Sequence, residues 1–295
     1  MSSMSEHLVE MAKALVGIKD GKIDVLTDPQ IKHCPLRKDI YGFEEESRET
    51  IRKSLQEHIR DLGMYGPARI LELEEKPVSF GASEILTDAM AEGLVDAAVV
   101  VCEGAGSVVV KRPEVLQAVG AHMVGLLRTE CIPEVRAGLV ERGCLLLDES
   151  DKLKEQCVID QVAGYQNALQ SGFRKIAVTV AGGRDFEIKK LRELGEASGI
   201  KPLILAVHTT GITFEQADVL ADCCDLVWSC ASKAVRDVVG KRSSMQIGIA
   251  IPVFALTREG KRLILNRALQ FKDQLVIHRG RLTYAPEGKQ PEPLI

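Results

Sequence analysis

Two hydrophobic patterns alternate along most of the chain from residue 69 onward. Short runs that are apolar throughout predict strands, and the segments between them, whose apolar residues recur at helical spacing, predict helices. Strands that are apolar at every position belong to parallel sheets that helices cover on both faces. The predicted strands are 70–73, 97–101, 144–147, 175–180, 203–207, 226–228 and 247–254, and the predicted helices are 82–92, 113–127, 133–142, 161–171, 186–198, 213–222, 233–240 and 258–271. The pattern therefore predicts an α/β fold on a mostly parallel sheet.

The two ends of the chain follow other patterns. A short helix at the N-terminus is expected to precede a β-hairpin, because alternating apolar residues at 15–18 and 22–26 flank the turn sequence Asp20-Gly21. A second hairpin is predicted near the C-terminus, with strands at 275–278 and 281–284. Pairing of the two hairpins with each other is compatible with the sequence.

The domain organisation follows from the absence of a linker rich in Pro, Gly or Ser. We expect one structural domain. Its N-terminal part, 1–66, holds the first hairpin, the loop around Cys34 and a charged helix at 44–62. The α/β core is 67–271, and the C-terminal hairpin and tail are 272–295.

Composition and charge narrow the class of function. Aromatic residues make up 4% of the 295 residues and the formal net charge is −4, so neither base stacking nor binding to a phosphate backbone is supported. The N-terminus is too polar for a signal peptide, and the longest apolar stretch, 95–101, is far too short to span a bilayer. We therefore expect a cytoplasmic protein that binds neither nucleic acid nor membrane. A small-molecule ligand or another protein would be its partner, and a homo-oligomer is compatible with the sequence.

Polar and ionisable residues gather directly after four successive predicted strands. Loops at the carboxyl ends of parallel strands open on the same edge of a sheet, where ligands bind in such folds. The four loops are CEGAG (102–106), AGGRD (181–185), HTTG (208–211) and SCASK (229–233). Their coincidence predicts a functional site at this edge.

Many residues of these loops have a simpler explanation, because Gly, Ser, Thr and Asp are the ordinary turn and capping residues between strands and helices. Turn formation does not explain Glu103, His208 and Lys233, which we take as candidate catalytic acid, base or anion-binding groups. The candidates for contact with a bound ligand or cofactor are Gly104, Gly106, Thr209, Thr210 and Ser232.

Eight cysteines are many for a protein of the cytosol, where disulfides are not expected. None has the CxxC spacing of zinc ribbons or ferredoxin-type clusters, so a metal site would have to combine distant segments. Cys102 and Cys230 lie at strand ends, and Cys34 lies in a loop where packing does not explain it. Three thiolates could hold a [4Fe–4S] cluster with one iron left open, or a zinc ion with an open position. The five cysteines that look structural are Cys131, Cys144, Cys157, Cys223 and Cys224.

Seven segments of the sequence resemble the family called methanogenesis marker protein 8. They are HCPL (33–36), FGASEIL (80–86), VVVCEGAGSVV (99–109), IDQVAG (159–164), KIAVTVA (175–181), AVHTTGI (206–212) and CASKAVRDVVG (230–240), in the same order and through nearly the whole chain. The family occurs in methanogenic archaea, so the resemblance implies an anaerobic cytoplasm and a link to methane metabolism, without specifying a reaction. The segments contain Cys34, Cys102 and Cys230 and none of the other five cysteines.

Three functions remain open at this point. The leading hypothesis is an iron–sulfur protein with an incompletely ligated cluster at the three cysteines. It would act in sulfur transfer or in the maturation of a methanogenesis enzyme or cofactor. The second hypothesis is a metal-free domain that binds a small anionic metabolite or cofactor through the Gly-rich loops and Lys233, and the third is a non-catalytic assembly factor with an exposed apolar surface. The distances between the three sulfur atoms separate these hypotheses, because the ligands of a cluster surround one compact core.

Overall fold

The computed structural model describes residues 6–121, 125–147, 156–277, 279–286 and 288–295. The largest element in these ranges is an eight-stranded sheet in the order β11-β12-β10-β9-β8-β4-β5-β7. The central strands β10, β9, β8 and β4 run parallel, whereas the strands at both edges pair antiparallel. In sheet order the strands span Met245–Ile247, Val253–Ala255, Leu226–Trp228, Leu203–Val207, Ile176–Ala181, Ala97–Cys102, Gly106–Val110 and Leu145–Leu146. The predicted fold class is confirmed.

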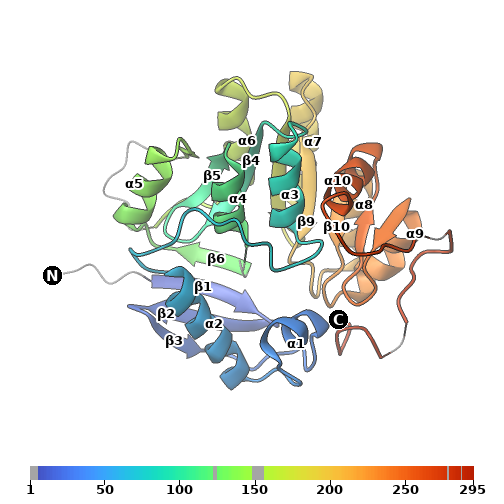
Figure 1. The fold of residues 1–295 in the computed structure, drawn as a ribbon, viewed down its shortest axis with the longest axis horizontal. Helices are drawn as coiled ribbons and strands as arrows, with labels where there is room; N and C mark the ends of the chain where they lie inside the picture. The colour runs from blue at the N-terminus through green and yellow to red at the C-terminus, as the bar shows by residue number, and fades with distance from the viewer. Residues whose placement is uncertain (1–5, 122–124, 148–155, 278, 287) are drawn as a thin grey trace.

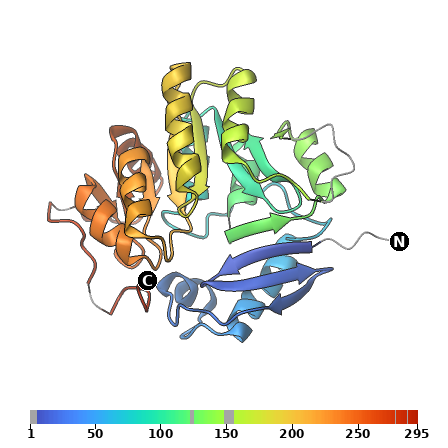
Figure 2. The same cartoon turned by 180° about the vertical axis from the view of Figure 1, so that it is seen from behind.

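Helices cover both faces of this sheet (Figures 1 and 2). On one face α3, α4, α5 and α10 enclose a core that includes Ile85, Leu116 and Ile264. On the other face α6, α7, α8 and the π-helix η1 bury residues such as Tyr165 and Ile188. The helices span Ala82–Ala91 (α3), Pro113–Gly120 (α4), Pro133–Glu141 (α5), Gln161–Gln170 (α6), Asp185–Ser198 (α7), Phe214–Cys223 (α8), Val235–Val239 (η1), Gly240–Arg242 (α9) and Arg258–Ala268 (α10). Because both faces are buried, the central strands are apolar at almost every position.

A second, antiparallel sheet in the order β3-β2-β1-β6 lies below the large sheet in Figure 1. Helix α2 packs Ile51 and Leu55 against it. The hairpin predicted about Asp20-Gly21 is confirmed, and the two turn residues have positive φ values of 50° and 72°, as a mirror-image hairpin turn requires. These elements span Lys22–Val25 (β3), Ala14–Lys19 (β2), Glu6–Met11 (β1), Gly125–Thr129 (β6), Pro35–Tyr41 (α1) and Arg48–Leu62 (α2).

The predicted N-terminal helix is wrong, and the predicted helix 113–127 is too long. The chain begins with strand β1, and α4 ends at Gly120, after which 125–129 form strand β6. These two strands pair with each other, His7 opposite Thr129, across 122 positions of sequence. Local apolar spacing carries no information about so distant a partner, and the pairing decides the conformation of both segments.

Two further strand predictions and the C-terminal hairpin also need correction. Residues 70–73 form no strand, and the predicted strand 247–254 is divided into β11 and β12, which pair with each other. The described residues of 272–295 contain no strand, so the C-terminal hairpin is not found there; His278, the end of one predicted strand, lies outside the described residues. The tail instead returns to the N-terminal loops, where Glu292 forms an isolated β-bridge with His33.

The carboxyl ends of the parallel strands face the small sheet. The N–H of Gly104, in the turn after β4, donates a 2.7 Å hydrogen bond to Oγ1 of Thr129 in β6. Gly211, in the loop after β9, lies so close to the side chain of Lys13 that a Cβ would be 2.8 Å from its Cε atom. The small sheet therefore lies across the edge at which the sequence predicts a site. In the parts of the chain described above, no helix has the length and apolar character needed to cross a membrane.

Candidate functional site

Two neighbouring parallel strands end in residues with left-handed backbone conformation. His208 follows β9 with a φ of 50°, and Cys230 follows β10 with a φ of 35°. Residues other than glycine rarely adopt such φ values, which cost about 1–2 kcal/mol. The two loops are linked, because the hydroxyl of Thr209 donates a 2.5 Å hydrogen bond to the carbonyl of Trp228. Unfavourable conformations that the surroundings enforce are concentrated at functional sites.

A buried arginine stands behind Cys230. Nη1 of Arg236 donates to the carbonyl oxygens of Ser229, Cys230 and Ser232 at 2.8–3.0 Å, and so holds the loop in its strained conformation. Burial lowers the pKa of Arg236 to about 10, and the charge of Cys230 acts in the opposite direction. In the described part of the chain, no carboxylate forms an ion pair with this guanidinium. A positive charge beside a half-exposed thiol is the environment of reactive and metal-ligating cysteines.

The structure brings Cys34 to the same edge of the sheet. Cys34 directly precedes α1, which lies next to the C-terminal tail in Figure 1. Burial raises the pKa of its thiol, and the charges of Glu46 and Cys230 act in the same direction, whereas Arg37 opposes them. Both Cys34 and Cys230 keep part of their surface exposed.

The C-terminal tail ties the two cysteine loops together. At one end Glu292 exchanges main-chain hydrogen bonds with His33, next to Cys34. At the other end the N–H of Ile295 donates to the carbonyl of Ala231, and a main-chain oxygen of Ile295 accepts from the N–H of Lys233, both at 3.0 Å. Main-chain contacts thus fix loops from opposite ends of the sequence against each other.

Cys102 lies apart from this pair. It ends β4, three strands from β10, which corresponds to about 14 Å across the sheet at about 4.8 Å per strand. Its side chain is fully buried in the core, and burial raises the pKa of its thiol well above the ordinary value. Nowhere in the described ranges do three His, Cys, Asp or Glu side chains converge closely enough to hold a metal ion. The structure thus brings together two of the three predicted ligands, and ligation by all three stays a prediction.

Glu103 is enclosed between the two sheets. Its Oε1 lies 2.5 Å from Nε of Arg69, and both side chains are almost completely buried. Burial raises the pKa of the neighbouring Tyr65 well above its ordinary value, and the charge of Glu103 adds to this effect. Oε2 of Glu103 and the hydroxyl of Tyr65 have no hydrogen-bond partner among the residues that the structure describes. The ion pair accounts for the burial of Glu103, and its assignment as a catalytic acid stays a prediction.

His208 and Lys233 are exposed at the strand ends. Desolvation by the surrounding protein lowers the pKa of His208 from 6.5 to about 4. The imidazole is therefore neutral at pH 7, which is the form that accepts a proton or binds a metal. Their predicted roles as base and anion-binding group are compatible with this placement and stay predictions.

The five residues predicted to contact a ligand all have local structural roles. Gly104 and Gly106 have φ values of 79° and 74° in the turn between β4 and β5. Thr209 and Thr210 link the loops after β9 and β10, and the hydroxyl of Ser232 accepts a hydrogen bond from the N–H of Val235. These roles are the simpler explanation of the residue types, and contact with a ligand stays a prediction.

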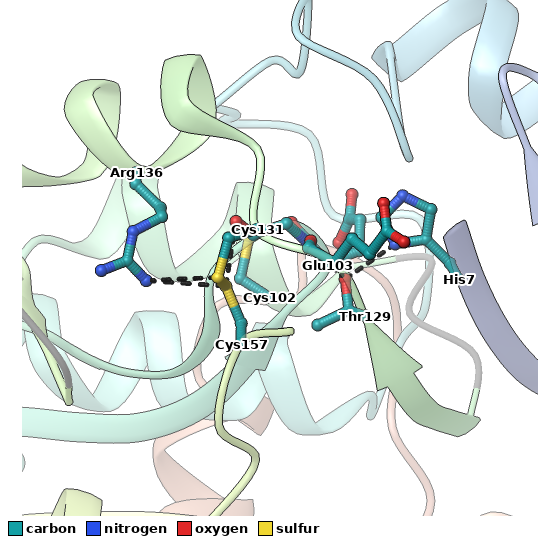
Figure 3. Close-up of a disulfide and its surroundings, with 9 residues drawn as sticks. His7, Cys102, Glu103, Thr129, Cys131, Arg136 and Cys157 are labelled. Carbon is teal, nitrogen blue, oxygen red and sulfur yellow. Dashed lines mark hydrogen bonds between the residues drawn. A yellow bond between two sulfur atoms is a disulfide. The ribbon is translucent and has the colours of Figure 1, made fainter. Parts of the chain in front are cut away.

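Sequence reasoning missed two features near these strand ends. Arg236 gave no signal, because an arginine inside a predicted helix is ordinarily solvent-exposed. The expectation that no disulfide forms is wrong for Cys131 and Cys157, which are joined by a disulfide beside the turn after β4 (Figure 3). Their separation of 26 residues matches no local motif. Tertiary contacts bring the two segments together, among them the β-bridge between Glu130 and Gln156.

The fold and site define an α/β protein in which the C-terminal tail joins two cysteine-containing loops where the parallel strands end. The chain belongs to the family described as "Uncharacterized protein conserved in archaea (DUF2099)", whose model matches residues 7–269. It is similar to "Uncharacterized protein MJ0054" of Methanocaldococcus jannaschii. The two are 34% identical over 293 residues, which cover 99% of this chain and 100% of the relative. The comparisons thus establish an archaeal family and name no reaction.

Proposed function

We propose that this protein is an iron–sulfur protein of methanogen metabolism that binds its cluster through Cys34 and Cys230. The observation that carries the proposal is that the C-terminal tail binds both cysteine loops, so that two partly exposed cysteines lie near each other at the edge where ligands bind in such folds. Cysteine thiolates are the usual protein ligands of iron–sulfur clusters. Neither cysteine is fully buried, although Cys230 packs at the margin of the core of the large sheet.

The charge around the pair suits an anionic centre. Arg236 places a buried positive charge behind Cys230 and pairs with no carboxylate of the described residues. Thiolates bound to a metal keep their negative charge, and a fixed cation nearby stabilises them. The same guanidinium hydrogen-bonds the loop carbonyls and so holds the Cys230 ligand in place before a cluster binds.

Two protein thiolates leave further ligand positions to fill. His208 ends the strand next to β10 and offers a neutral imidazole at pH 7, which makes it one candidate for a third ligand. Cys102 is the other candidate, and it would require the turn after β4 to move. A cluster with fewer than four protein ligands supplies an open iron site to which a substrate atom can bind.

The link to methanogenesis is part of the proposal. It is supported by the seven segments that resemble the methanogenesis marker protein 8 family and by the relative from Methanocaldococcus jannaschii. The role that fits is sulfur transfer or maturation of a methanogenesis enzyme or cofactor, with that enzyme as the partner.

The test measures iron and acid-labile sulfide per chain, with the visible absorption spectrum, on protein purified without oxygen. We expect the cluster in the wild type and its loss in Cys34→Ser and Cys230→Ser. The control is Cys223→Ser, because Cys223 is also half-buried but lies at the end of α8. His208→Gln and Cys102→Ser then identify the third ligand. A wild-type protein that stays colourless after reconstitution with iron and sulfide, or full cluster content in both Cys34→Ser and Cys230→Ser, would overturn the proposal.

A further inference from the structure

The Cys131–Cys157 disulfide lies at the surface of the junction between the two sheets. Cys131 follows β6, and Cys157 belongs to the segment that crosses the turn after β4. Their Cα atoms are 5.1 Å apart and both residues keep part of their surface exposed. A thiol reagent can therefore approach this disulfide.

One arginine contacts both sulfur atoms. Nη1 of Arg136, in the first turns of α5, lies 3.5 Å from Sγ of Cys157 and 3.8 Å from Sγ of Cys131 (Figure 3). Disulfide sulfur is a weak acceptor, whereas a thiolate forms a charge-assisted hydrogen bond with a guanidinium. Arg136 therefore stabilises the reduced pair, in its thiolate form, more than it stabilises the disulfide.

A carbonyl group also lies where it can stabilise the reduced state of Cys157. The carbonyl oxygen of Gly104 lies 3.5 Å from Sγ of Cys157. It can accept a hydrogen bond from the Cys157 thiol but gains nothing from a disulfide sulfur, which carries no proton. Arg136 and Gly104 thus provide one partner for a thiolate and one for a thiol.

We propose that Cys131 and Cys157 form a thiol–disulfide exchange site whose reaction partner is a dithiol. One thiolate of the dithiol attacks a sulfur of the disulfide, forms a mixed disulfide and releases the other cysteine as a thiolate beside Arg136. The second thiol of the dithiol, deprotonated, then displaces the first cysteine. Two electrons pass to the protein, the dithiol leaves as its cyclic disulfide, and its two protons pass to the cysteines or to solvent. The site involves neither Cys34 nor Cys230 and is independent of the cluster proposal.

The exchange changes the contacts that fix the segment of Cys157 and Val158, which crosses the turn after β4. With the disulfide intact, the N–H of Cys157 donates to the carbonyl of Thr129 at 2.9 Å, and the carbonyl of Val158 accepts from the N–H of Ser107 at 2.8 Å. Reduction removes the covalent link to Cys131 and leaves the main-chain hydrogen bonds. The same Thr129 hydrogen-bonds His7 and Gly104, so the redox state of the pair acts at the contact between the two sheets.

The test equilibrates the protein, without oxygen, in mixtures of reduced and oxidised dithiothreitol. Free thiols are then alkylated, and the labelled cysteines are identified by mass spectrometry. We expect Cys131 and Cys157 to become alkylated together, in one reversible transition, while the circular dichroism spectrum stays native. In Arg136→Met the ratio of reduced to oxidised reagent at half-conversion rises about tenfold, equivalent to about 30 mV, and Arg136→Lys lies between this variant and the wild type.

The control is Arg142→Met, because Arg142 directly follows the same helix and bonds Gly138 instead of a sulfur atom. It should leave the half-conversion ratio unchanged. Alkylation of both cysteines in fully oxidised buffer would overturn the proposal, because no disulfide would then exist. Loss of the native spectrum on reduction, or equal ratios in the wild type and Arg136→Met, would also overturn it.

Discussion

Arg69 and Glu103 form an ion pair that is almost completely buried, with Nε and Oε1 2.5 Å apart. Nη2 of Arg69 also donates to the carbonyl of Ala118 at 2.7 Å. The pair joins the turn after β4 to the loop after α2, so it lies at the junction of the two sheets. A buried charge that loses its partner is costly, because neither water nor another charge compensates it.

Glu103→Gln should therefore lower the free energy of unfolding by about 3–5 kcal/mol, since Arg69 would keep its charge without a counter-charge. Urea denaturation measures the change. The control is Glu72→Gln, which removes partly exposed pairs with Arg112 at 3.0 Å and Arg142 at 3.2 Å and should cost less than about 1 kcal/mol. Equal effects of the two substitutions would show that burial of the Arg69–Glu103 pair does not cause the loss of stability.

Glycine should suit position 230 better than alanine does. Cys230 has a φ of 35°, which strains any residue that carries a Cβ. Cys230→Gly is therefore expected to be more stable than Cys230→Ala by about 1 kcal/mol, measured by thermal unfolding. The control is Ala221→Gly in helix α8, where the glycine variant should instead be less stable than the wild type by about 1 kcal/mol. If alanine is favoured at both positions, the left-handed conformation of Cys230 is wrong.

The stability of the protein should fall as the pH drops from about 6.5 to about 4, in part because of His7. Burial lowers the pKa of His7 to about 4, and the backbone of Tyr65 and the charge of Glu6 oppose this shift. Between these two pH values the unfolded chain binds a proton at this site that the folded protein does not, so stability rises with pH across the window and levels off above it. The effect amounts to at most about 3 kcal/mol, at about 1.4 kcal/mol per unit.

His7→Gln should flatten this part of the pH profile, measured as the free energy of unfolding at several pH values. Thr129→Val is the matched control, because it removes the 2.7 Å hydrogen bond to the ring but no titrating group. It should lower stability at every pH and keep the slope. An unchanged slope in His7→Gln would exclude His7 as the source of the pH dependence of stability.

Gly106 leaves no room for a side chain. It has a φ of 74°, and a Cβ would lie 2.1 Å from the carbonyl oxygen of Val158. Gly106→Ala should therefore cost at least about 2 kcal/mol of unfolding free energy, from the left-handed backbone and the clash together. Gly183→Ala is the control, because a Cβ there meets open space, and it should change stability by less than about 1 kcal/mol. A neutral Gly106→Ala would mean that the Val158 segment does not cross the turn closely.

The sequence was most informative for the centre of the large sheet. The strands 97–102, 176–181, 203–207 and 226–228 lie within one or two residues of their predicted bounds. Each is buried on both faces, so its residues are apolar without interruption, and that pattern is visible locally. The hairpin about Asp20-Gly21 was predictable for a similar reason, because the positive φ of its turn restricts the residue types.

The location of the candidate site could be predicted from the sequence, but only some of the residues that form it could. Parallel strands carry their loops to one edge, so Cys230, His208 and Lys233 could be placed there from the order of elements alone. Arg236 could not, because its role depends on carbonyl groups that the loop turns toward it. Cys102 ends a parallel strand, as predicted, but its distance from the other cysteines depends on the strand order, which the local sequence pattern does not show.

The sequence by itself determined the spacing of apolar residues in each segment. This spacing indicated the α/β class, the central strands and the edge that carries the ionisable loops. Only the tertiary structure decided that β1 pairs with β6, that Cys131 meets Cys157 and that the C-terminal tail joins the Cys34 and Cys230 loops. The first kind of information is local, because burial of a face prescribes which residues along one element are apolar. The second kind depends on contacts between segments far apart in the chain, and their geometry leaves no periodic trace in either segment.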